Sequence, residues 1–179
     1  LEECFASMKP INHRVLMVEL KSANPKIVPE LKNEVEKYHF EDHLVTTSFH
    51  RDQILRMKTY LPGISTGALV GKLPNSNNLL SNVSQVMLEA QKYNSTYNPA
   101  YQANLIPIME ATKHRGITFW PWALDAETFK KLYIAGTYGI TTNSSQLYSK
   151  YIVDIQAPKS AQVQMNIPVS MNVQLKQQD

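Results

Sequence analysis

The sequence has no apolar run that approaches the roughly 20 residues needed to span a bilayer, and it does not open with the basic and then apolar order of a signal peptide. Its single cysteine, Cys4, excludes an internal disulfide framework and any metal site built from several cysteines. The 18 basic and 15 acidic residues are scattered without a basic block, so we do not expect nucleic acid as a partner. Charged residues make up only 18% of the chain and hydrophobic residues 43%, a composition typical of a globular protein rather than a disordered one.

The 179 residues suffice for one domain with a substantial core. The opening stretch L-E-E-C-F-A-S-M-K-P has the pattern of the last turns of an amphipathic helix that ends at Pro10. We therefore expect this chain to be part of a longer protein.

Strands and helices alternate along most of the chain. Apolar and β-branched stretches predict strands at residues 14–21, 44–49, 64–70, 117–124 and 139–142, and residues 95–98 form a short extended piece in the same series. Helical spacing and capping residues predict helices at residues 25–38, 52–60, 83–93, 101–115, 126–135 and 145–151. Pro107 should kink the fourth of these helices and Gly116 should end it. About six strand–helix units with short connections favour an α/β fold of the (β/α)8 TIM-barrel type, with fewer units than the closed barrel has.

The pattern changes in the last part of the chain. From Val163 to Leu175, apolar residues alternate strictly with polar ones, which predicts a β-strand, and Pro168 places it at an edge or a bend. We therefore divide the chain into a barrel part, residues 1–151, and a C-terminal β-strand extension, residues 152–179. An alternating strand of this kind is expected to pair with an exposed sheet edge, either in its own chain or in a second copy, which predicts a homo-oligomer as one outcome.

The first predicted strand ends in two charged residues. Val15, Met17, Glu19 and Lys21 share one face of the strand, and the other face is wholly apolar. If buried, a glutamate costs several kcal/mol unless it is paired or binds a cation. One interpretation is an ordinary salt bridge at a strand end, and the other is an active site at the carboxyl end of a barrel strand.

Four motifs follow one another along residues 1–151: V-E-L-K, T-T-S-F, G-I-T-F-W-P-W-A-L-D and A-G-T-Y-G-I-T-T-N. Their order and spacing resemble those of the glycerophosphodiester phosphodiesterase family, from the third to the eighth strand of its barrel. The resemblance implies that Glu19 is a metal ligand, that Lys21 faces the substrate phosphate, and that Phe49 and Trp122 line the substrate pocket. A carboxylate ligand favours Mg or Ca as the divalent cation. The chain departs from the family pattern where Ala123, Leu124 and Asp125 replace T-V-N, and where Asn143 replaces an aspartate.

The family's first two barrel strands carry H-R-G, E-N-T, an aspartate and a catalytic histidine, and this chain has no counterpart of those strands. His114-Arg115-Gly116 spells H-R-G, but it follows a predicted helix and is interpreted as a helix cap. Only His50, which follows Phe49, is placed where a histidine could line a pocket.

The resemblance implies metal-dependent hydrolysis of a glycerophosphodiester, or of a related substrate derived from a phospholipid, to glycerol 3-phosphate and an alcohol. Without the catalytic histidine pair, this chain is expected to be inactive by itself. The alternative is a non-catalytic degenerate barrel or an accessory interaction module of a membrane-associated protein. A membrane-associated or extracellular location is favoured over a cytoplasmic one.

Overall fold

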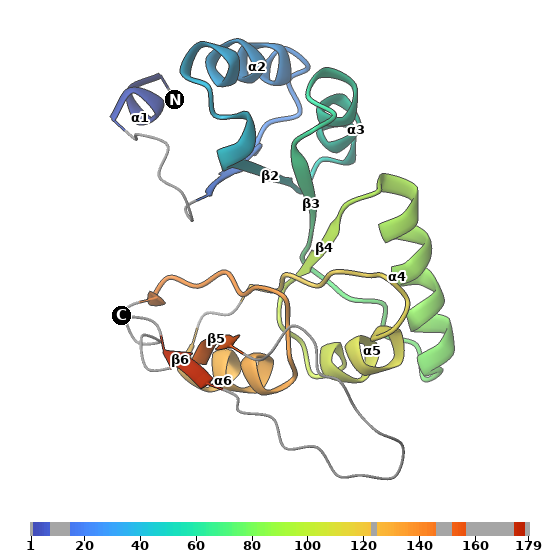
Figure 1. The fold of residues 1–179 in the computed structure, drawn as a ribbon. Coiled ribbons are helices and arrows are strands. Elements are labelled where there is room, and N and C mark those ends of the chain that lie inside the picture. The colour runs from blue at the N-terminus through green and yellow to red at the C-terminus, as the bar shows by residue number, and fades with distance from the viewer. Residues whose placement is uncertain (1, 8–14, 123–124, 146–151, 157–173, 178–179) are drawn as a thin grey trace, which may run out of the picture.

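The computed structural model describes residues 2–7, 15–122, 125–145, 152–156 and 174–177. Its main sheet has four parallel strands in the order β1-β2-β3-β4 (Figure 1). The strands are β1 (Leu16–Glu19), β2 (Leu44–Ser48), β3 (Ser65–Val70) and β4 (Thr96–Pro99). The helices are α1 (Glu2–Ser7), α2 (Ile27–Tyr38), α3 (Arg51–Tyr60), α4 (Leu79–Tyr93), α5 (Leu105–Thr112) and α6 (Ala126–Ile134), and a 3-10 turn, η1 (Glu41–His43), precedes β2.

The parallel order continues beyond β4 without forming regular strands. The Tyr97 amide donates to the Thr118 carbonyl at 2.9 Å, and the Trp122 amide donates to the Pro99 carbonyl at 3.0 Å. The Thr141 amide then donates to the Pro121 carbonyl at 2.9 Å. Six consecutive segments therefore lie side by side in parallel, which agrees with the predicted number of strand–helix units.

The regular strands predicted at 117–124 and 139–142 are wrong. In the described part of these segments there are only single parallel bridges, Tyr97 to Phe119, Ala100 to Trp122 and Trp122 to Thr141. Pro121 explains the interruption, because a proline has no N–H group and cannot donate a ladder hydrogen bond.

Two helices differ from their predicted bounds. Helix α4 begins at Leu79, four residues earlier than expected, because the Asn78 side chain accepts a hydrogen bond from the Ser81 amide and caps it. Helix α5 begins only at Leu105, so Pro107 lies in the first turn, where its missing N–H removes no hydrogen bond of the helix. The predicted kink is therefore not needed. Gly116 does adopt a left-handed conformation, with φ of 72°, in the turn that follows α5.

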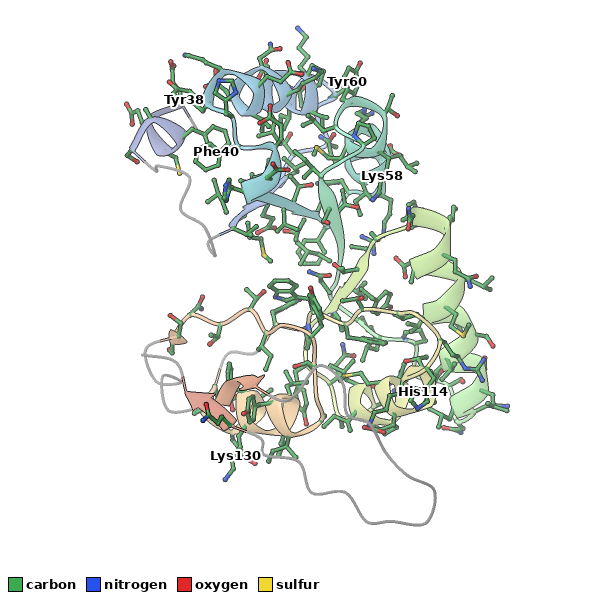
Figure 2. The ribbon with its side chains drawn as sticks, in the orientation of Figure 1. Tyr38, Phe40, Lys58, Tyr60, His114 and Lys130 are labelled. Atoms are coloured by element: carbon green, nitrogen blue, oxygen red, sulfur yellow. The ribbon has the colours of Figure 1, made fainter. Side chains whose placement is uncertain are left out.

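Apolar faces of the helices pack against the sheet in two clusters. One joins β1 to α1, α2 and α3, and the other joins β4 to α4, α5 and α6. Phe5 holds α1 in place: it is almost fully buried, and its ring lies 4.8 Å from the Phe40 ring and 6.1 Å from the Tyr38 ring. Figure 2 shows Tyr38 and Phe40 next to α1.

The end of the chain forms a second, two-stranded sheet. Strand β6 (Gln174–Gln177) pairs antiparallel with β5 (Ile152–Gln156). Of the strand predicted at 163–175, only residues 174–175 are described, and they belong to β6. The rest of that strand, and the predicted helix at 145–151 beyond residue 145, lie outside the described residues. Strand β5 had not been predicted. In the described part of the chain, β6 pairs with β5 and not with an edge of the main sheet.

Within the same described residues, no helix is long and apolar enough to cross a membrane.

Candidate functional site at the carboxyl ends of the strands

A pocket of about 470 Å³ opens at the carboxyl ends of the parallel segments. Glu19 ends β1, Phe49 follows β2, and Trp122 belongs to the segment that pairs with β4 and with the residues after it. All three line this pocket, although 103 residues separate the first from the last. The remaining lining residues are Met17, Thr47, Leu69, Asn98, Thr141, Thr142 and Asn143.

The predicted site residue Lys21 lies apart from this pocket. Its side chain is 79% exposed and lines a second pocket between β1 and α2, to which Glu19 also contributes. The Lys21 ammonium lies 3.8 Å from Oε2 of Glu19, and the Glu19 side chain is itself 36% exposed. An ion pair this exposed contributes about 0 to 1 kcal/mol. Glu19 is therefore not buried, contrary to the condition on which its expected cost depended. Its charge is solvated and does not require a partner at this position.

Ser48 joins the ends of the two strands that carry Glu19 and Phe49. Its buried hydroxyl donates to the Leu20 carbonyl at 2.7 Å and accepts from the His50 amide at 2.9 Å. The Leu20 amide in turn donates to the Thr47 carbonyl at 2.8 Å. These bonds continue the pairing of β1 with β2 past the last residue of β1, and they fix the backbone next to both pocket residues.

The two aromatic residues of the pocket offer different surfaces. The Phe49 ring is 49% exposed, which is high for so large an apolar side chain, and it stands at the rim. Trp122 is half-buried, and its indole Nε1 is shielded from solvent without a hydrogen-bond partner. An unpaired buried N–H costs about 1 to 3 kcal/mol, which a ligand acceptor could recover.

Asn98 is a pocket residue that the sequence reasoning missed. It is 2% exposed, and its Oδ1 accepts a hydrogen bond from the Thr96 hydroxyl at 2.7 Å. Thr96 and Asn98 occupy the same face of β4, so two polar residues two apart in a short strand were the available signal. The interpretation of 95–98 as merely extended overlooked it.

Arg51 is a second residue that was missed, and it acts behind the pocket wall. Its guanidinium donates to the carbonyls of Phe49 at 3.3 Å and Leu69 at 3.0 Å. Both of these residues line the pocket, so Arg51 connects the ends of β2 and β3. No local pattern in the sequence marks a first-turn arginine for this role.

Two histidine predictions have different outcomes. The Nε2 of His50 lies 2.9 Å from the Lys21 carbonyl, so this ring bonds to the backbone after β1 and does not line the main pocket. His114, labelled in Figure 2, is exposed in the turn after α5, as expected for a helix end. In the described part of the chain, no histidine lines the main pocket.

The side chains that line the pocket can be compared with the ligands that the predicted cation needs. Glu19 is the one carboxylate among the described lining residues, with Asn98 and Asn143 as amide neighbours. No group of three His, Cys, Asp or Glu side chains gathers within the described residues. Since Ca needs six to eight oxygen ligands and Mg near-octahedral coordination, these residues do not form a complete cation site.

A series of parallel β/α units with a pocket at the carboxyl ends of the strands is the arrangement of TIM-barrel enzymes. The comparisons with solved structures agree with this fold. The chain is similar to a glycerophosphoryl diester phosphodiesterase from Agrobacterium tumefaciens, with a TM-score of 0.66, 16% identity, and 82% of this chain and 60% of that chain covered. It is also similar to a glycerophosphodiester phosphodiesterase from Galdieria sulphuraria, with a TM-score of 0.64, 22% identity, and 79% and 59% covered.

A phosphodiesterase from Oleispira antarctica, whose structure contains the product sn-glycerol-3-phosphate, matches with a TM-score of 0.55 and 16% identity, with 74% of this chain and 53% of that chain covered. No family model and no curated protein matches the sequence. The chain spans only 46% to 60% of the length of five such solved structures, the three above included. The resemblance inferred from the motifs is thus confirmed for the fold: the chain has the fold of part of this α/β barrel.

Proposed function

We propose that this chain forms the substrate-binding side of a phosphodiester hydrolase that converts glycerophosphodiesters to glycerol 3-phosphate and an alcohol. The observation that carries the proposal is the convergence of Glu19, Phe49 and Trp122 on one pocket at the carboxyl ends of parallel strands. The product bound in the Oleispira antarctica neighbour supports glycerol 3-phosphate as the probe of this pocket.

The described side chains suit the glycerol end of such a substrate. Phe49 and Trp122 offer apolar ring surfaces for its CH₂ groups, and the unpaired, shielded indole N–H of Trp122 would donate to one of its oxygens after a rotation of the ring. Asn98 is buried on the pocket wall and adds a polar group that can fix orientation. Together they bind and orient the substrate.

Charge at the pocket rim is the second part of the proposal. The exposed Lys21 ammonium is held only weakly by Glu19, so it can turn toward a phosphate that reaches the rim. Glu19 is proposed as one ligand of Mg or Ca, with further ligands from outside the described residues. Such a cation would stabilise charge that develops on the phosphoryl oxygens.

Proton transfer is the part of the reaction that these residues leave open. Because no described histidine lines the pocket, the chain by itself is proposed to bind ligand without turning it over. The location at a membrane or an extracellular face also remains a prediction.

The test separates binding from turnover. Glycerol 3-phosphate is titrated into this chain by calorimetry with and without Ca or Mg, and hydrolysis of glycerophosphocholine is measured on the full-length protein. Glu19→Gln should remove the effect of the cation on binding and lower kcat/KM about 100-fold or more. Glu41→Gln makes the same charge change at an exposed position in η1 and should alter neither quantity.

Two results would count against the proposal. Full hydrolytic activity of Glu19→Gln at saturating Mg or Ca would exclude the role of Glu19. Absence of both ligand binding and hydrolysis in a folded wild-type protein would instead favour the non-catalytic barrel or interaction module.

A further inference from the structure

We infer that the opposite, amino-terminal side of the sheet carries a second binding site, for a phosphate group of a small organic phosphomonoester. A pocket of about 380 Å³ lies where β3 and β4 begin, between the ends of α3 and α4 and the turn after α5. The candidate active site lies at the carboxyl ends of the strands, so the two pockets occupy opposite ends of the sheet.

Two cationic side chains line this pocket, and no carboxylate lines it among the described residues. Lys58 comes from the last turn of α3, where Figure 2 shows it, and Arg115 comes from the turn after α5. Among the residues that the structure describes, no carboxylate lies within ion-pair distance of either side chain, whereas six other basic side chains there form ion pairs. Two positive charges without counter-charges create a potential that favours an anion.

The Lys58 ammonium is also partly desolvated. Burial lowers its pKa below the usual value, with no acidic neighbour to raise it again. A bound phosphate would supply the missing negative charge.

The pocket wall contains hydroxyl groups without hydrogen-bond partners. Thr66 is 2% exposed, and its Oγ1 is shielded and unpaired. The Oγ of Ser95, on the neighbouring strand end, is in the same condition. Thr66 and Ser95 both belong to the pocket wall. Unpaired buried hydroxyls destabilise a fold, and phosphate oxygens are strong acceptors that could satisfy them after a side-chain rotation.

The negative dipole ends of α3 and α4 are an alternative reason for the two cations, and they explain them less well than a bound anion does. A helix carboxyl end carries about half a negative charge and does attract basic residues. However, among the described residues neither the Lys58 ammonium nor the Arg115 guanidinium donates to a helix carbonyl, and the Arg115 guanidinium instead contacts Sδ of Met87 at 3.9 Å. Two full positive charges also exceed the partial charges of the two helix ends, which together come to about one negative charge.

The size of the pocket indicates what accompanies the phosphate. At about 380 Å³ it falls within the usual range of small-molecule sites and is larger than inorganic phosphate requires. We therefore expect a sugar phosphate to bind more tightly than phosphate itself.

The experiment titrates the chain with inorganic phosphate, and separately with ribose 5-phosphate, at constant ionic strength, and follows backbone amide shifts by NMR. Saturable shifts are expected at residues 65–66, 95–96 and 115–116. Lys58→Met and Arg115→Gln should each raise the dissociation constant about tenfold or more. Lys113→Gln is the matched control, because Lys113 lies two residues from Arg115, pairs with Glu110 and does not line this pocket.

A second measurement, of thermal stability, distinguishes loss of phosphate binding from loss of folding. Thr66→Val keeps the shape of the side chain but removes the unpaired hydroxyl, so it should raise the melting temperature without ligand and reduce the gain on adding phosphate. Equal weakening by Lys113→Gln and Arg115→Gln would show general charge screening and overturn the site. Linear, non-saturating shifts would overturn it as well. Because the readout is at the amino ends of β3 and β4, neither result depends on the proposed hydrolase activity.

Discussion

The Arg51 guanidinium joins α3 to the Glu89 carboxylate on α4. Its Nε lies 2.8 Å and its Nη2 2.5 Å from Oε1 of Glu89, and both side chains are largely shielded from solvent. Because Nη1 of Arg51 also donates to the Leu69 carbonyl, this pair links two helices to the rim of the candidate active site.

Replacing Arg51 by methionine should therefore destabilise the protein more than loss of a surface ion pair would. The change leaves Glu89 without its partner and removes the donors to the strand-end carbonyls, so the free energy of unfolding should fall by about 2 kcal/mol or more. Lys113→Met, which breaks an exposed pair with Glu110, should change it by less than about 0.5 kcal/mol. Urea unfolding measures both, and equal losses would contradict the role given to Arg51.

Gly67 should not tolerate a side chain. A Cβ at this position would lie 2.7 Å from Nδ2 of Asn98, so Gly67→Ala should cost about 1 to 3 kcal/mol. Gly63→Ala is the control, because a Cβ there meets nothing within 4 Å. Adding Asn98→Ala should relieve part of the cost of Gly67→Ala, since the two sites touch. Strictly additive losses in urea unfolding would refute this explanation.

Tyr97 should make stability depend on alkaline pH. Burial, followed by the nearby negative charge of Glu89, raises its pKa to about 12, against about 10 in an unfolded chain. The folded state then keeps a proton that the unfolded state loses, so this contribution is complete below about pH 10 and falls as the pH rises toward 12. Tyr97→Phe should remove that fall, whereas Tyr138→Phe, at a highly exposed position, should not. Parallel stability curves for wild type and Tyr97→Phe would show that Tyr97 does not titrate in this way.

Trp122→Ala should impair ligand binding more than folding. Trp122 is half-buried at the pocket, so its loss should cost less than the roughly 3 to 5 kcal/mol of a fully buried tryptophan, while the dissociation constant for glycerol 3-phosphate rises. Trp120 packs against Gly139 and Tyr138 away from this pocket, so Trp120→Ala should reduce stability and leave binding unchanged in the folded fraction. Calorimetry with thermal unfolding distinguishes the two. A large stability loss with unchanged binding would make Trp122 an ordinary core residue.

Much of this fold could be read from local periodicity and from motif order. The alternation of strands and helices predicted β1 to β4 and α2, α3 and α6 to within a few residues, because the spacing of apolar side chains and the capping residues act locally. The family resemblance, rather than these boundaries, singled out Glu19, Phe49 and Trp122 as site residues.

Contacts between distant segments could not be predicted from local periodicity or motif order. Whether Lys21 faces the pocket depends on the turn after β1, and the role of Arg51 depends on α4 arriving 38 residues later at Glu89. The burial of Asn98 likewise depends on Gly67 in the neighbouring strand.

The sequence by itself determined the order of the parallel units and the residue types at their carboxyl ends, because both follow from local side-chain spacing. Only the tertiary structure decided which of these side chains share a pocket. Crossover connections bring strand ends together across long stretches of chain, and the packing of each helix sets the direction in which the neighbouring strand ends point.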